Sequence, residues 1–200
     1  MRVGKWSFVF LIGLVLVACG RSKESQFYVL NPIPPKKQQM NTFSYLKIGI
    51  DEVNCPAYIE KPQLMIHYTP HQIALKEFHQ WAEALNKNIM RVVETNLSTL
   101  LPGAVVESFP WDSKFKPNYH LQINIADFAI ASNGSSILRA EYIIYHDRDL
   151  IEKHDVYYHL KLTQVTPEAL VVSMNSNLTC LTETIARSFM AGKYRREDLK

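Results

Sequence analysis

Hydrophobic and polar residues alternate along several stretches of this 200-residue chain, and a period of two is typical of β-strands with one buried face. In one short example, Leu46, Ile48 and Ile50 alternate with polar or small residues. Three longer stretches predict an antiparallel meander, because Asn133-Gly134 is a favoured hairpin turn between the first two. The predicted strands cover residues 27–30, 46–51, 63–68, 104–109, 119–125, 138–144 and 156–162.

Two other stretches carry apolar residues at intervals of three and four, which places them on one face of a helix. The first covers residues 78–101, but its start is open because residues 78–83 also fit an extended chain. The second begins at the cap Thr166 and ends at Gly192. The predicted buried stripes are Trp81, Leu85, Ile89, Val92, Val93, Leu97 and Leu100 in the first helix, and Leu170, Met174, Leu178, Leu181, Ile185 and Phe189 in the second.

Together these elements predict one layered domain of the α/β (or α+β) class. It has a mixed, largely antiparallel sheet and two main amphipathic helices. Residues 31–40 contain three prolines and predict a loop, because proline cannot complete a sheet ladder. No composition shift or linker divides the rest of the chain.

The N-terminus predicts export and a lipid anchor. Arg2 and Lys5 precede an apolar run of about eleven residues, which fits a signal-peptide core and is too short to span a bilayer. The run ends in Leu16-Val17-Ala18-Cys19, which resembles the lipobox of bacterial lipoproteins. That resemblance implies cleavage before Cys19 and acylation of Cys19 by a diacylglycerol and a third chain such as palmitate. The alternative is an ordinary secretory signal or a short membrane anchor.

The lipobox also sets the expected organisation of the chain. Residues 1–18 form the signal peptide, 19–26 a lipidated tether, 27–192 a single periplasmic domain and 193–200 a polar C-terminal tail. Gly20 stands where an aspartate commonly retains lipoproteins of Gram-negative bacteria in the inner membrane. We therefore expect a protein held in the outer membrane by its lipid and facing the periplasm.

Composition and charge narrow the function. A hydrophobic content of 47% and a formal charge of +3 describe a globular protein without the clustered positive charge of a nucleic-acid-binding surface. In the oxidising periplasm, Cys55 and Cys180 could form a disulfide. The alternative is that both are free thiols that pack as small apolar groups.

The sequence lacks the familiar motifs of catalytic sites. It has no nucleophile elbow and no glycine-rich phosphate loop, and Pro70 separates His67 from His71. We therefore predict neither an enzyme nor a metal or cofactor site. Tyr142, Tyr145, Tyr157 and Tyr158 lie on adjacent predicted strands, where they either pack in the core or form an aromatic interface.

Several short motifs follow the lipobox in a specific order, and together they resemble the PqiC (YmbA-like) family of lipoproteins. Two residues depart from that pattern, Ala84 in place of a frequent proline and Cys55 in place of an aliphatic residue. The motifs are Phe27-Tyr28-Val29-Leu30, Ile48-Gly49-Ile50, Pro56-Ala57-Tyr58-Ile59-Glu60-Lys61-Pro62-Gln63-Leu64, Phe78-His79-Gln80-Trp81-Ala82-Glu83, Asn88-Ile89, Asn96-Leu97 and Phe109-Pro110-Trp111.

The resemblance implies a non-enzymatic auxiliary component of an MCE/ABC-type intermembrane lipid transport system that supports envelope integrity. Its partner would be an MCE-domain (PqiB-like) protein, whose conduit this lipoprotein would tether to the outer membrane. The alternative is a periplasmic lipid-binding carrier, and a homo-oligomer is an open question.

Within the loop at residues 54–63, Pro56, Tyr58 and Pro62 are the predicted partner contact. The competing interpretation is that Tyr58 packs under the loop.

Overall fold

The computed structural model describes residues 23–35 and 41–191. It is a single α/β domain built from a five-stranded sheet, a three-stranded sheet and two helices. The elements in chain order are β1 (Gln26–Tyr28), β2 (Lys47–Asn54), β3 (Gln63–Thr69), β4 (Gln72–Trp81), α2 (Leu85–Leu100), β5 (Val105–Ser108), β6 (Tyr119–Ile130), β7 (Ser135–His146), β8 (Asp149–Lys161) and α3 (Pro167–Met190).

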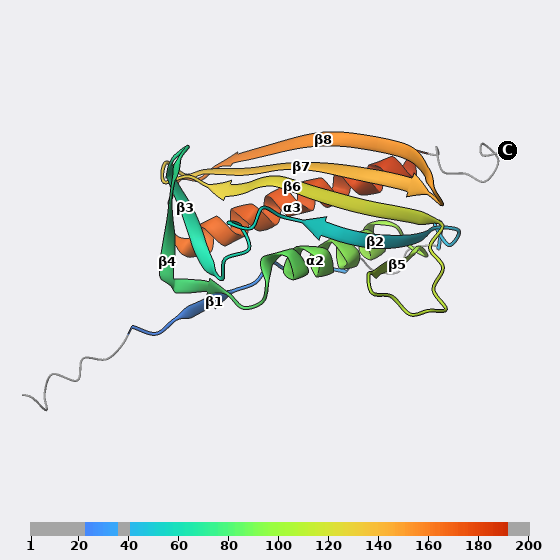
Figure 1. Cartoon of the computed structure of the whole chain (residues 1–200), viewed down its shortest axis with the longest axis horizontal. Coiled ribbons are helices and arrows are strands. Elements are labelled where there is room, and N and C mark those ends of the chain that lie inside the picture. Colours follow the sequence, from blue (N-terminus) through green and yellow to red (C-terminus); the bar gives the residue numbers. More distant parts are fainter. Residues whose placement is uncertain (1–22, 36–40, 192–200) are drawn as a thin grey trace, which may run out of the picture.

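The five-stranded sheet has the order β5-β2-β6-β7-β8 and is mixed. β2 pairs in parallel with β5 and β6, whereas the longer β6-β7 and β7-β8 pairs are antiparallel. Helix α2 packs on β2 and β5, α3 packs on β6, β7 and β8, and the two helices contact each other (Figure 1). The hydrophobic core lies between this sheet and the helices.

The smaller sheet, of order β1-β4-β3, lies at one end of the molecule (Figure 1). It joins the larger sheet through β3, since the backbone N–H of Ser132 donates to the His67 carbonyl at 2.8 Å. β1 is also at this end, and the β7–β8 turn and the loop after β5 are at the opposite end (Figure 1). The domain therefore has one end near the start of the described chain and one end remote from it.

The predicted meander is confirmed. Pairing of β6 with β7 and of β7 with β8 is antiparallel along their length. Gly134 in the first turn has a φ of +84°, and a Cβ there would lie 2.7 Å from the Leu162 carbonyl oxygen. Glycine is needed at this turn because any other L-residue would be strained and would collide with that carbonyl.

The prediction of helix α3, of its N-terminal cap and of its buried apolar stripe is also confirmed. The Thr166 hydroxyl accepts a hydrogen bond from the Ala169 N–H at 3.2 Å, and Pro167 opens the helix. The helix ends at Met190, with Ala191 as its cap. Gly192, the predicted stop, lies outside the described residues. All six predicted stripe residues of this helix are buried.

The first helix is shorter than the limits we predicted, because residues 78–81 belong to β4 and α2 begins only at Leu85. Backbone pairing explains the difference, since His79, Gln80 and Trp81 pair with all three residues of β1. A strand held between β1 and β3 satisfies these backbone groups without a helix. Of the two alternatives for residues 78–83, the extended chain is therefore correct for residues 78–81, and Trp81 is not part of the helical stripe. The β3–β4 hairpin was not predicted.

A set of asparagines fixes the segment that follows β1 to the two helices. Buried Asn88 of α2 accepts from the Leu30 N–H at 2.6 Å and donates to the Leu30 carbonyl at 3.1 Å. Asn96, about two helical turns further along α2, accepts from the Ile33 N–H at 2.8 Å. On α3, Asn175 accepts from the Asn31 N–H at 2.8 Å. We call Asn88, Asn96 and Asn175 the asparagine clamp.

The clamp leads to a stability prediction. Asn88→Ala leaves the N–H and the carbonyl of fully buried Leu30 without these partners, and should lower the free energy of unfolding by about 2 kcal/mol or more. Urea denaturation followed by circular dichroism measures the change. Ser176→Ala, an exposed hydroxyl on α3, is the control and should change stability by less than about 0.5 kcal/mol. Equal small effects of both substitutions would contradict a structural role for the clamp.

Candidate functional site

The loop between β2 and β3, residues 55–62, has a fixed shape although much of it is exposed. Ile59 is buried and its N–H donates to the Pro56 carbonyl at 2.8 Å. At the other end, the Pro62 carbonyl accepts from the Trp81 N–H at 2.7 Å. Pro62 and Tyr58 are exposed, and Pro56 is half-buried. The three residues predicted as a partner contact therefore lie on one loop that is attached to the core at both ends.

Tyr58 is partly packed and partly open. The residue is 36% exposed, and its ring meets the His67 ring edge-on at a centroid distance of 6.4 Å. Burial, and after it the nearby Asp127 carboxylate, raises the pKa of Tyr58. The structure thus combines the two interpretations of Tyr58, since one edge packs on His67 and Asp127 and the remainder faces solvent.

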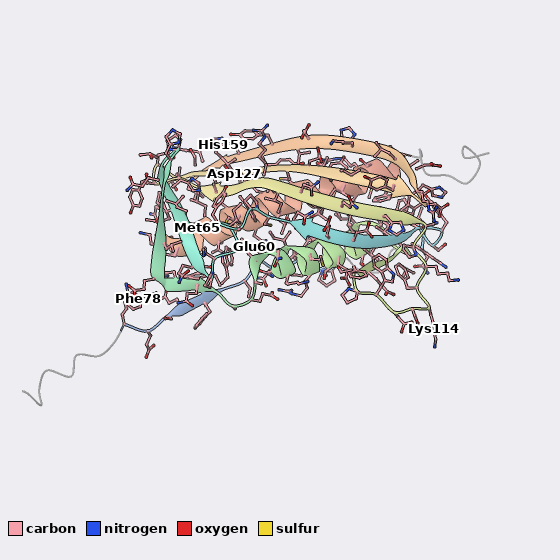
Figure 2. The ribbon with its side chains drawn as sticks, in the orientation of Figure 1. Glu60, Met65, Phe78, Lys114, Asp127 and His159 are labelled. Atoms are coloured by element: carbon pink, nitrogen blue, oxygen red, sulfur yellow. The ribbon has the colours of Figure 1, made fainter. Side chains whose placement is uncertain are left out.

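Asp127 connects this loop to the main sheet. It lies on β6 at a shift in register between Ile125 and Asp127, close to the end of β6 that meets β3 (Figure 2). Burial raises the pKa of Asp127, and nearby His67 and the Tyr58 hydroxyl partly offset that effect. Its Oδ1 atom is buried without a hydrogen-bond partner among the described residues. The sequence offered no signal for this position, because an aspartate in an alternating strand is ordinarily exposed.

A cluster of aromatic rings occupies the opposite end of the domain, where Figure 2 labels Lys114. Trp111 contacts Phe109, Phe115 and His120 edge-on, at centroid distances of 5.4, 6.0 and 6.0 Å. A Cβ on Gly49 would lie 3.0 Å from the Trp111 ring. The motifs Ile48-Gly49-Ile50 and Phe109-Pro110-Trp111 are therefore parts of one packing unit, a relation that the sequence pattern did not reveal.

The two cysteines of the described chain are both free thiols in the structure, so the alternative of a Cys55–Cys180 disulfide is not formed there. Burial raises the pKa of Cys55 to about 12, and the Glu60 carboxylate adds to the effect. The Cys55 thiol is consequently protonated at neutral pH, and a protonated thiol is a poor nucleophile. Cys19, the predicted lipidation site, lies outside the described residues.

The four tyrosines of the meander do not form one patch. Tyr142 and Tyr158 face α3, where their hydroxyls bond to Ser188 at 2.9 Å and Thr184 at 2.7 Å. Tyr157 is 62% exposed and Tyr145 is half-buried. Core packing is therefore the correct interpretation for Tyr142 and Tyr158.

Within residues 23–35 and 41–191, no group of three or more His, Cys, Asp or Glu side chains is placed to hold a metal ion. No helix in this part of the chain has the length and apolar character of a membrane span.

Solved structures with the same architecture exist. A crystal structure of an uncharacterized protein matches with a TM-score of 0.70 at 22% identity and covers 84% of this chain and 99% of its own. A crystal structure of a protein from Xanthomonas campestris matches with a TM-score of 0.64 at 13% identity, covering 81% of this chain and 93% of its own. At these identities the likeness establishes the fold.

Sequence comparison identifies the family. The chain is 23% identical over 150 residues to the intermembrane transport lipoprotein PqiC of Escherichia coli strain K12, covering 74% of this chain and 78% of the relative. The Shigella flexneri protein of the same name matches to the same extent. A family model for the ABC-type transport auxiliary lipoprotein component matches residues 28–186, so the chain belongs to this family of auxiliary lipoproteins of ABC-type transport.

Proposed function

We propose that this auxiliary transport lipoprotein is a non-enzymatic tether in the outer membrane. It faces the periplasm and holds the conduit of an MCE-domain (PqiB-like) protein in an intermembrane lipid transport system. The observation that carries the proposal is the asparagine clamp, which joins the segment nearest the lipid anchor to both helices of the core. An anchor connected in this way can hold the whole domain in place.

The mechanics follow from the chain order. Acyl chains on Cys19 would hold the protein on the bilayer, since two or more chains give a stable anchor. Eleven residues further along the chain, Leu30 is bonded to Asn88. A pull on the anchor is therefore shared between β4, through its pairing with β1, and the helices α2 and α3, through residues 30–33.

The surface around Tyr58 supports a partner contact. Pro56, Tyr58 and Pro62 lie on a loop attached at both ends, so little conformational entropy is lost when a partner covers it. Tyrosine is enriched at protein interfaces because it combines apolar area with a hydroxyl. We assign this loop to the contact with the MCE-domain protein.

The packing of the interior favours a tether over a lipid carrier. A carrier would need a hollow space between the layers. The side chains between the five-stranded sheet and the helices are instead packed together, and Ile48, Leu121 and Leu178 have no exposed area. This arrangement supports a domain that acts through its surface.

Association of several copies is compatible with this role. β8 is a 13-residue strand at the edge of the five-stranded sheet, and it exposes Leu150 and Tyr157. Exposed edge strands are the usual place at which further chains pair. A homo-oligomer formed through β8 would present several Tyr58 loops to one conduit.

Removal of the lipid tests the anchor. Cys19→Ala, in a chain whose signal peptide is still cleaved, should give a folded protein in the soluble periplasm that no longer supports transport. Cell fractionation locates the protein, and detergent sensitivity of the cells reports envelope integrity. Normal detergent resistance with the soluble protein would contradict the tether.

Truncation of Tyr58 tests the partner contact. Tyr58→Ala should reduce the recovery of the MCE-domain protein by about tenfold when this lipoprotein is isolated in mild detergent, because a buried tyrosine often dominates an interface. Tyr45→Ala is the matched control, since Tyr45 is 42% exposed and also contacts one neighbouring ring. The thermal unfolding temperature is measured for both. A similar loss of partner with both variants, or a loss explained by unfolding of Tyr58→Ala, would sink the assignment.

A further inference from the structure

An exposed apolar patch lies beside the start of the described chain. Phe27 of β1 is 63% exposed, Val29 is 38% exposed, and Val172 of α3 is 55% exposed. All three line a groove of about 330 Å³ between β1 and the first turns of α3. We call Phe27, Val29 and Val172 the anchor-side patch. Apolar side chains that gather at one exposed place commonly mark a contact surface.

The patch is close to the predicted anchor in sequence and in space. The Lys23 ammonium lies 5.3 Å from the centre of the Phe78 ring, which places the first described residue against β4. Phe78 is at the same end of the molecule as β1, opposite Lys114 (Figure 2). Cys19 precedes Lys23 by four residues, and four fully extended residues span at most ~14 Å. An acylated Cys19 therefore keeps this end of the domain near the bilayer surface.

Charges around the patch are of both signs. Lys23, Glu24 and Glu168 are all exposed at this end, and Glu168 also lines the groove, together with Asn175 and Ser176. A contact driven by anionic headgroups would need an excess of lysine or arginine. The apolar side chains are thus the feature of this surface that suits a bilayer, and the contact they make would depend little on salt or on lipid charge.

We propose that the anchor-side patch rests on the membrane that holds Cys19, with Phe27, Val29 and Val172 in the interfacial region of the lipid. The proposal depends on the lipid anchor of the proposed function. A short tether gives the patch a high effective concentration at the bilayer, so three apolar side chains suffice for a contact that a free domain would not keep. The contact orients the domain with its β1 end on the lipid and the aromatic cluster of Trp111 pointing away from it.

Depth-dependent fluorescence quenching tests the contact. Lipidated protein carrying Phe27→Trp is purified from membranes and incorporated in phosphatidylcholine vesicles with or without brominated acyl chains. Leu150→Trp is the matched control, because Leu150 is 56% exposed and is the second residue of β8, which starts at the opposite end. After subtraction of the unsubstituted protein, the bromine-dependent quenching should be at least about twofold greater for Phe27→Trp. The excess should persist at high salt and fall when Val172→Glu is added.

The outcomes separate the patch from the anchor. Flotation with the vesicles reports the anchor, and quenching reports the patch. If both tryptophan variants float but are quenched equally, the patch does not touch the membrane and the proposal is wrong. Shielding of Phe27→Trp only after addition of the MCE-domain protein would also overturn it and would assign the groove to that partner. If neither variant floats, the lipid anchor itself fails and the patch proposal fails with it.

Discussion

The backbone of residues 30–33 lies outside both sheets, and the structure depends on how its polar groups are satisfied. Leu30 is fully buried, and a buried N–H or carbonyl without a partner is costly. Asn88 provides both a donor and an acceptor for Leu30, and Asn96 and Asn175 accept from the next residues of the segment. Side chains of two helices thus replace the ladder that a neighbouring strand would supply.

This constraint determines how the rest of the domain is used. β1 lies at one end together with the β3–β4 hairpin (Figure 1), and Tyr58 packs there on His67 of β3. The meander extends away from that end, and the Trp111 cluster lies at the far side, on the loop between β5 and β6 and on His120 of β6. The two proposed contacts, the anchor-side patch and the Tyr58 loop, lie on one packed body, so a domain of this shape could link a membrane to a transport protein.

Sequence pattern predicted the regular part of this fold, but it did not predict the polar details. The meander and α3 were predictable because their apolar periods repeat over many residues and agree with the Gly134 turn and the Thr166 cap. For residues 78–83 the sequence left a helix and an extended chain open, and residues 78–81 are extended because their pairing with β1 is a tertiary contact that outweighs local period. Asn88 and Asn96 stood out as motif residues, yet their role depends on a segment about sixty residues away. The position of Asp127 beside Tyr58 could not be predicted, because it depends on a shift in strand register in β6.

The central claim is that the anchor-proximal segment belongs to the folded core and does not act as a loose leader. Native-state amide hydrogen exchange of the lipidated protein tests it directly at Leu30 and Ile33. If the asparagine clamp holds, both amides exchange as slowly as those in the middle of α2, such as Ile89, because all of them open only with global unfolding. Exchange at the rate of an exposed terminus, while Ile89 stays protected, would contradict the account.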